Sequence, residues 1–143
     1  LYLDSETRTY VEETGGANVL FVKADGTLVV PKSHTDSILP SITRRSLVQV
    51  AEDLGMNVEE RFVEWAEVAS GAFVECGLCG TAAVISPVGQ IDNKVYGANE
   101  EITFPNGKDE IGPVMKKLRE TLTGIQDGAL EDKHGWDCKI DVD

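Results

Sequence analysis

The chain passes from an apolar turn straight into a helix within one stretch, Ser37-Ile38-Leu39-Pro40-Ser41-Ile42-Thr43-Arg44-Arg45. Pro40 fixes its own φ and disfavours the α region for Leu39, so the chain should arrive extended. Ser41 can then act as the N-cap of a helix, because its hydroxyl accepts a hydrogen bond from a first-turn N–H group. The stretch therefore predicts a helix that begins directly after Ser41.

This helix start is a candidate anion site. The N–H groups at Ile42 and Thr43 and the Thr43 hydroxyl would converge on one point, where the helix dipole also favours negative charge. Arg44 and Arg45 are expected to add positive charge beside it in an acidic protein. The alternative is a capped amphipathic helix with no ligand.

Apolar residues after this start recur at spacings of three and four residues, as on the buried face of a helix. Gly55 then provides a residue suited to the left-handed conformation that ends many helices. We expect a helix from Thr43 to Leu54, with one face formed by Leu47, Val50, Ala51 and Leu54.

Upstream, the run Asn18-Val19-Leu20-Phe21-Val22 is continuously apolar after its first residue, which is typical of a strand inside a sheet. Asp25-Gly26 predicts a type I′ hairpin turn, and Leu28-Val29-Val30 is the return strand. Shorter β-like runs at residues 1–3 and 10–13 precede them.

Downstream, strand patterns alternate with two further helices. Gly112-Pro113 opens the last helix, because proline is tolerated in the first turn. The whole pattern predicts a mixed α+β domain, mainly antiparallel. Its remaining strands are expected at residues 58–63, 72–76, 82–88, 91–96 and 102–104, and a short helix at 64–69.

Length and composition restrict the kind of protein. The 143 residues, 41% of them hydrophobic, can bury one core, so we expect one domain over residues 1–143. The formal net charge of −12 argues against nucleic acid and anionic membranes as partners.

The sequence shows no sign of a membrane span or of a disulfide framework. No apolar stretch approaches the roughly 20 residues of a membrane span, and three cysteines do not make a disulfide framework. We expect a cytoplasmic protein.

Two further positions could contact a ligand. Gly80-Thr81 places a hydroxyl and open backbone at a turn between strands, which suits a phosphate or carboxylate oxygen, although such a pair is often only a turn.

Glu12-Glu13 ends a strand before Gly15-Gly16, and strand alternation points one of the two carboxylates inward. An inward carboxylate could hold a protonated heterocyclic nitrogen, whereas solvation of both side chains is the alternative.

Cys76 and Cys79 have the spacing of a redox or zinc motif. A redox pair should open a helix after a strand, but Gly77 and Gly80 mark a turn between strands here. A zinc site would need two more ligands, and the remaining candidates are scattered singly. We therefore expect two half-buried thiols and no metal site.

Several motifs together resemble the fold type IV pyridoxal-phosphate enzymes, and among them the branched-chain amino-acid aminotransferases. They include Glu13 before Gly15-Gly16-Ala17-Asn18, the stretch 37–45, and Gly80-Thr81-Ala82-Ala83 with Pro87-Val88. Gly112-Pro113, the segment 122–128 and Gly135-Trp136 also fit that family. The resemblance extends over nearly the whole chain, in order.

The resemblance implies a large domain built as a β-pseudobarrel flanked by helices, with pyridoxal 5′-phosphate as cofactor. Glu13 would contact the pyridine nitrogen, and Leu39 would pack against the ring. Ile42, Thr43 and Thr81 would hold the phosphate, while the amides of Thr81 and Ala82 would receive the substrate carboxylate.

The resemblance also implies what this chain would lack. The Schiff-base lysine of the family precedes the position that corresponds to Leu1, and Leu1-Tyr2-Leu3-Asp4 reads as a strand already under way. We therefore expect a C-terminal fragment that has no catalytic lysine of its own and does not transaminate alone.

The implied activity is transfer of an amino group from Leu, Ile or Val to 2-oxoglutarate, by an enzyme of branched-chain amino-acid biosynthesis that acts as a homodimer. A D-amino-acid aminotransferase or an aminodeoxychorismate lyase shares the fold, although the Gly135-Trp136 segment argues against both. A non-catalytic phosphate-binding module is an alternative from another class, and a thiol-based redox or zinc protein is a third.

Overall fold

The computed structural model describes residues 1–107 and 109–140. In chain order the helices and strands are β1 (Asn18–Lys23), β2 (Leu28–Pro31), α1 (Ile42–Asp53), β3 (Val58–Arg61), α2 (Trp65–Ala69), β4 (Phe73–Gly80), β5 (Val84–Val88), β6 (Gln90–Asn93), β7 (Glu100–Thr103) and α3 (Pro113–Gln126). A 3₁₀ turn at Val95–Gly97 lies between β6 and β7.

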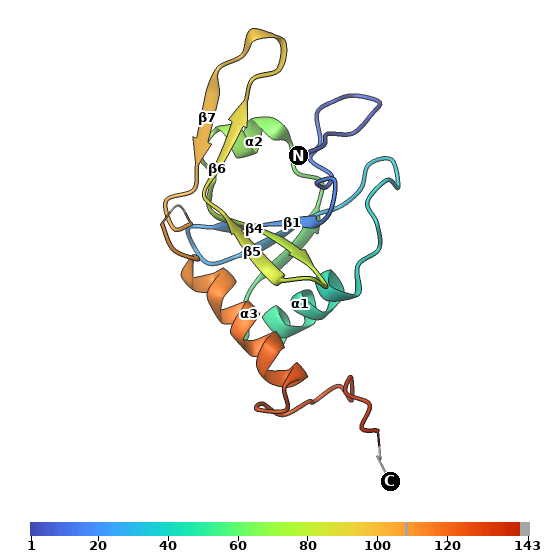
Figure 1. The fold of residues 1–143 in the computed structure, drawn as a ribbon. Coiled ribbons are helices and arrows are strands. Elements are labelled where there is room, and N and C mark those ends of the chain that lie inside the picture. The colour runs from blue at the N-terminus through green and yellow to red at the C-terminus, as the bar shows by residue number, and fades with distance from the viewer. Residues whose placement is uncertain (108, 141–143) are drawn as a thin grey trace.

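Five strands form one sheet in the order β3-β2-β1-β4-β5, and β6 pairs with β7 in a separate hairpin. All pairings are antiparallel except that of β2 with β3, which α1 connects. The helices α1 and α3 lie together on one face of the larger sheet, while α2, the β6–β7 hairpin and the N-terminal segment lie on the other side (Figure 1). The predicted α+β class, mainly antiparallel with flanking helices, is confirmed.

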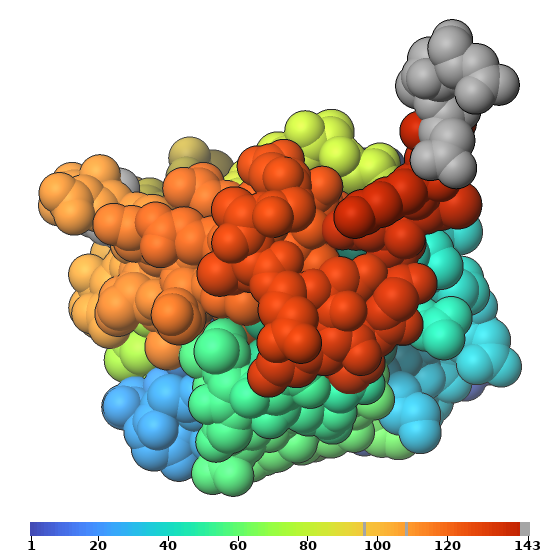
Figure 2. Space-filling view, turned by 90° about the horizontal axis from the view of Figure 1, so that it is seen from below, coloured from blue at the N-terminus to red at the C-terminus, as the bar shows by residue number. Residues whose placement is uncertain are grey.

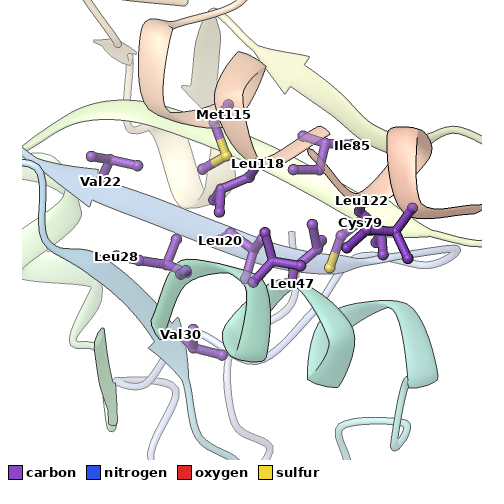
Figure 3. Close-up of a cluster of buried hydrophobic side chains, with 13 residues drawn as sticks. Leu20, Val22, Leu28, Val30, Leu47, Cys79, Ile85, Met115, Leu118 and Leu122 are labelled. Carbon is purple, nitrogen blue, oxygen red and sulfur yellow. The ribbon is translucent and has the colours of Figure 1, made fainter. Parts of the chain in front are cut away.

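The central strand β1 is buried on both faces, as its continuous apolar run predicted. Leu20 and Val22 point toward the helices, where they meet side chains of β2, α1 and α3 (Figure 3). Val19 and Phe21 point to the opposite face, where the Phe21 ring stacks on Phe73 with centroids 4.7 Å apart. The sheet therefore separates two hydrophobic cores.

Both long helices begin close to the predicted residues, and α1 also ends close to its predicted end. In α1, the buried residues Leu47, Val50 and Ala51 lie on one face, and Gly55 follows the helix with a φ of +74°. In α3, Pro113 is the first helical residue, as Gly112-Pro113 predicted. The predictions are confirmed within one residue at both ends of α1 and at the start of α3.

The turn between β1 and β2 differs from the prediction. Gly26 has a φ of +85°, but Asp25 is not among the residues with positive φ. A type I′ turn needs positive φ at both central residues, so that prediction is wrong. Instead the Asp25 carboxylate accepts a hydrogen bond from the Thr27 N–H at 2.9 Å, which stabilises a wider turn.

After α3 the chain turns back along the helical layer. His134 Nε2 lies 2.7 Å from Asp53 Oδ2 at the end of α1, and its ring stacks on Trp136 at 4.8 Å. Figure 2 shows α3 and this C-terminal segment across the face formed by the helices. Among residues 1–107 and 109–140, no helix has the length and apolar character needed to cross a membrane.

Candidate functional site

Three segments that are distant in sequence meet around a surface cavity of about 400 Å³. They are the loop that enters β1, the lead-in to α1, and the start of the β4–β5 turn, which lies beside the first turn of α1 (Figure 1). The lining residues are Glu13, Thr14, Gly15, Gly16, Ala17, Asn18, Leu39, Pro40, Ser41, Ile42, Gly80 and Thr81. The cavity thus joins the two anion-binding positions predicted from the sequence.

The first turn of α1 faces this cavity. Ser41 is extended, with φ −105° and ψ 127°, and its hydroxyl accepts a hydrogen bond from the Arg44 N–H at 3.1 Å. The first helical hydrogen bond runs from the Arg45 N–H to the Ser41 carbonyl. The N–H groups of Ile42 and Thr43 precede it and have no partner within the helix, so they can bind an anion.

Glu13 also lines this cavity, and its carboxylate has partners on two other segments. Its Oε2 accepts hydrogen bonds from Asn18 Nδ2 at 2.9 Å and from the Leu39 N–H at 3.2 Å. Its backbone carbonyl accepts from the Tyr2 N–H at 2.7 Å. Both side-chain contacts use the same oxygen, so within the described residues Oε1 stays available to a ligand.

Asn18 belongs to this site, although the sequence reasoning did not select it. The residue is 4% exposed, and Nδ2 also lies 3.4 Å from the Leu39 carbonyl. Its Oδ1 is buried without a hydrogen-bond partner among the described residues. The signal in the sequence was weak: Asn18 is the polar first residue before the apolar run of residues 19–22.

Glu12 points away from Glu13, into the segment before α1. It is 5% exposed, and it accepts hydrogen bonds from the hydroxyls of Ser37, Thr35 and Ser33. Burial raises the pKa of Glu12, but these hydrogen bonds outweigh burial and hold the pKa below its ordinary value. One of the two carboxylates points inward, as predicted, but it is Glu12, whereas Glu13 is the one that lines the cavity.

The side chains of Leu39 and Ile42 form an exposed apolar rim, with 70% and 71% of their surface accessible. Thr43 is buried and Ala82 is exposed on the turn, and neither lines the cavity. The structure therefore brings Glu13, Leu39, Ile42 and Thr81 together and leaves those two beside the cavity.

The turn that carries Thr81 has an unusual backbone. Val84, directly after it, has a φ of +57°, which is a strained conformation for a β-branched residue. A Cβ added at Gly80 would meet no atom within 4 Å, so the backbone there is open to the cavity.

The two arginines do not act as predicted. Arg44 turns back toward the sheet, where Nη2 donates to the Pro31 carbonyl at 3.1 Å and lies 3.6 Å from Glu60. Arg45 is exposed and lines a different hollow, beside Trp136. The prediction that both add charge at the helix start is wrong for their side chains, because neither lines the cavity at Glu13 and Thr81.

The cysteines are structural. Cys76 and Cys79 are each 1% exposed and lie in the two different cores, on opposite faces of β4. Burial raises the pKa of the Cys79 thiol to about 11, and it also raises the pKa of Cys76. They are more buried than expected. Among the described residues there is also no group of three side chains that could hold a metal ion.

Comparison with known proteins connects this geometry to one family. The model of the family described as amino-transferase class IV matches residues 3–91. The branched-chain-amino-acid aminotransferase of Mycobacterium tuberculosis is 44% identical over 147 residues, which cover 98% of this chain and 38% of that protein. The chain therefore spans well under half of the length of this relative.

Solved structures agree with the sequence comparison. The branched-chain amino acid aminotransferase of Escherichia coli is similar with a TM-score of 0.75 and 34% identity, over 94% of this chain and 40% of that one. The enzyme of Thermobaculum terrenum in its PLP form has a TM-score of 0.71 and 35% identity, over 90% and 37%.

Proposed function

The chain belongs to the class IV aminotransferases, and we propose that it forms the part of a branched-chain-amino-acid aminotransferase that binds pyridoxal 5′-phosphate. The observation that carries the proposal is the single cavity that joins a helix start, a carboxylate and the Thr81 turn. The chain covers 38% of its relative, so the activity, substrates and partners of the whole protein are part of the proposal.

The residues present fit this cofactor. A phosphate group needs converging donors, and the N–H groups of Ile42 and Thr43 and the Thr81 hydroxyl would supply them. A protonated pyridine nitrogen needs a carboxylate acceptor, and Glu13 Oε1 would accept from it at the end of the ring away from the phosphate. The flat ring between these ends would contact the exposed side chain of Leu39.

When bound, pyridoxal phosphate supplies an electron sink for the electron pair released at the substrate Cα. Glu13 would keep the pyridine nitrogen protonated, because an adjacent carboxylate favours the charged form. Asn18 and the Leu39 N–H hold Glu13 Oε2 by hydrogen bonds, so the position of the second oxygen, Oε1, is restricted as well. The amides of Thr81 and Ala82 would bind the carboxylate of the amino acid or 2-oxo acid.

We also propose the substrates, of which the relatives' names support the branched-chain amino acids. The amino donors would be Leu, Ile and Val, and 2-oxoglutarate would be the acceptor. The homodimer and the cytoplasmic location expected from the sequence stay predictions. The relatives' names favour this function over a D-amino-acid aminotransferase and over a non-catalytic phosphate site.

Calorimetric titration of the 143-residue chain with pyridoxamine 5′-phosphate tests the proposal, because this form has no aldehyde that could react with stray lysines. We expect binding that Thr81→Ala weakens about tenfold, since a hydrogen bond to a charged phosphate is lost. Thr103→Ala is the matched control, because Thr103 is exposed on β7. No binding by the unaltered chain, or equal binding by Thr81→Ala, would overturn the proposal.

A further inference from the structure

Glu12 is a buried carboxylate that the proposed cofactor contacts leave unused. Its oxygens accept hydrogen bonds from Thr35 Oγ1 at 2.8 Å, Ser33 Oγ at 3.2 Å and the Ser37 hydroxyl. No basic side chain of the described residues forms an ion pair with it. A buried charge without an ion-pair partner must be compensated by hydrogen bonds, and here all three side-chain donors belong to residues 33–37.

This segment has few other polar contacts to hold it. The Lys32 N–H donates to the Arg61 carbonyl, and the next backbone hydrogen bond along the chain belongs to α1. Between them, residues 33–40 make no backbone-to-backbone hydrogen bond with the described part of the chain. The His34 ring stacks on Tyr10 with centroids 4.9 Å apart, and Ile38 is buried. Glu12 therefore provides the main polar attachment of the segment.

The same segment leads directly to the ring end of the cavity. The Leu39 N–H donates to Glu13 Oε2, and its carbonyl accepts from Asn18. Glu12 and Glu13 are adjacent on an extended backbone, so their side chains point to opposite sides. Two neighbouring carboxylates thus hold one segment, Glu12 at residues 33–37 and Glu13 at Leu39.

The backbone that carries both carboxylates is well fixed. The Val11 N–H donates to the Val63 carbonyl at 2.8 Å, and the Glu12 N–H donates to the Tyr2 carbonyl at 3.0 Å. The first turn of α1 has a separate support, because Leu47 and Val50 anchor that helix in the core. The ring end of the cavity is therefore attached through Glu12, and the phosphate end through the helix.

We infer that Glu12 is a positioning residue that acts through residues 33–37 to set where Leu39 and Glu13 stand against the cofactor ring. The inference rests on the proposed function, because it presupposes a ring at that end of the cavity. Glu12 would touch neither cofactor nor substrate. Its loss would affect recognition of the ring and spare recognition of phosphate.

Pyridoxamine 5′-phosphate and inorganic phosphate test the ring end and the phosphate end of the cavity separately. Glu12→Gln keeps the size of the side chain but replaces one acceptor oxygen with a donor. We expect the Kd of pyridoxamine 5′-phosphate to rise about tenfold and that of inorganic phosphate to change less than about twofold. A merely structural role would reduce the folded fraction and weaken both probes by the same factor. Glu52→Gln, an exposed carboxylate of α1, is the control for the change in charge.

A second variant tests the route through the loop. Thr35→Val removes one hydroxyl donor while keeping the shape of the side chain, so we expect the ring-bearing probe to weaken about threefold. Adding Glu12→Gln to Thr35→Val should have less than the sum of the separate effects, because both changes remove the same attachment. If Glu12→Gln does not fold, Thr35→Val alone tests the inference. The measured quantity is then the ratio of the Kd of pyridoxamine 5′-phosphate to the Kd of inorganic phosphate.

The outcomes distinguish the inference from the proposed function. Absence of pyridoxamine-phosphate binding by the unaltered chain overturns the proposed function, and the inference with it. Binding that is sensitive to Thr81→Ala but unchanged by Glu12→Gln and by Thr35→Val overturns only the inference. Equal weakening of both probes also overturns it.

Discussion

The two long helices begin in contrasting environments. At the start of α1 the cap is local, from Ser41, and the first turn opens on a cavity of about 400 Å³. At the start of α3, Gly112 offers no side-chain cap, and the buried carboxylate of Glu75 in β4 accepts hydrogen bonds from the N–H groups of Val114 and Met115 at 3.2 and 2.9 Å. One helix start is occupied by a side chain of the protein itself, and the other opens on a cavity.

At the start of α3, Glu75 and Gly112 are packed too closely to leave space for a ligand. Glu75 is 1% exposed, and a Cβ added to Gly112 would lie 2.2 Å from its carboxyl carbon. A helix dipole attracts an anion equally at both helices, so the dipole does not decide which one binds a ligand. What decides is whether a carboxylate from another element already occupies the position.

The largest effect is expected where the protein fills its own helix start. Glu75→Ala would leave two N–H groups of α3 without partners in the protein interior, and we expect the free energy of unfolding to fall by about 3 kcal/mol. Urea denaturation measures this change. Glu101→Ala, on the exposed side of β7, is the control. A loss below about 1 kcal/mol would mean that Glu75 contributes little to the start of α3.

A smaller effect is expected at the open helix start. Ser41→Ala removes the hydroxyl that accepts from the Arg44 N–H, and loss of such a cap costs about 1 kcal/mol because water can replace it. Ser46→Ala, within the same helix, controls for the change in helix propensity. The same denaturation experiment compares both helices. A loss at Ser41 as large as that at Glu75 would contradict the contrast between them.

The smallest effect concerns pH and the lead-in to α1. The pKa of Glu12 lies below its ordinary value of 4.5, because the loop hydroxyls outweigh its burial. Its stabilising contribution is therefore complete above the unfolded pKa and is lost as pH falls through the lower folded pKa. We expect the stability difference between the unaltered chain and Glu12→Gln to shrink as pH falls from about 6 to about 3.5. A constant difference across this range would show that ionised Glu12 is not favoured in the folded state.

The sequence was informative about helix starts but not about what fills them. Pro40-Ser41 and Gly112-Pro113 both marked a start within one residue, because capping and proline preferences act locally. Glu75 could not be assigned to α3, since its contact depends on how β4 and α3 pack. Glu12 and Glu13 show the same limit: alternation predicted opposite directions, but only tertiary structure shows which carboxylate borders the cavity.

The arginines show where a local argument misleads. Arg44 follows the helix start directly, yet its long side chain reaches the Pro31 carbonyl and Glu60 instead of the cavity. Position in sequence fixes the Cα of a residue far better than the charged end of a long side chain. Ile42 and Thr81, which were selected for their place on the backbone, do line the cavity.

The position of β1 at the centre of the sheet also has a kinetic consequence. Asn18 in β1 pairs with Cys79 in β4, so the sheet closes only after a long stretch of chain has been arranged. Such distant pairing makes folding slow, because loop-closure entropy is lost before the contacts form. The cavity is lined by Glu13, Ile42 and Thr81, so it is complete only after β1 and β4 have paired. A bound phosphate ligand should therefore slow the unfolding of this chain and leave its refolding rate unchanged.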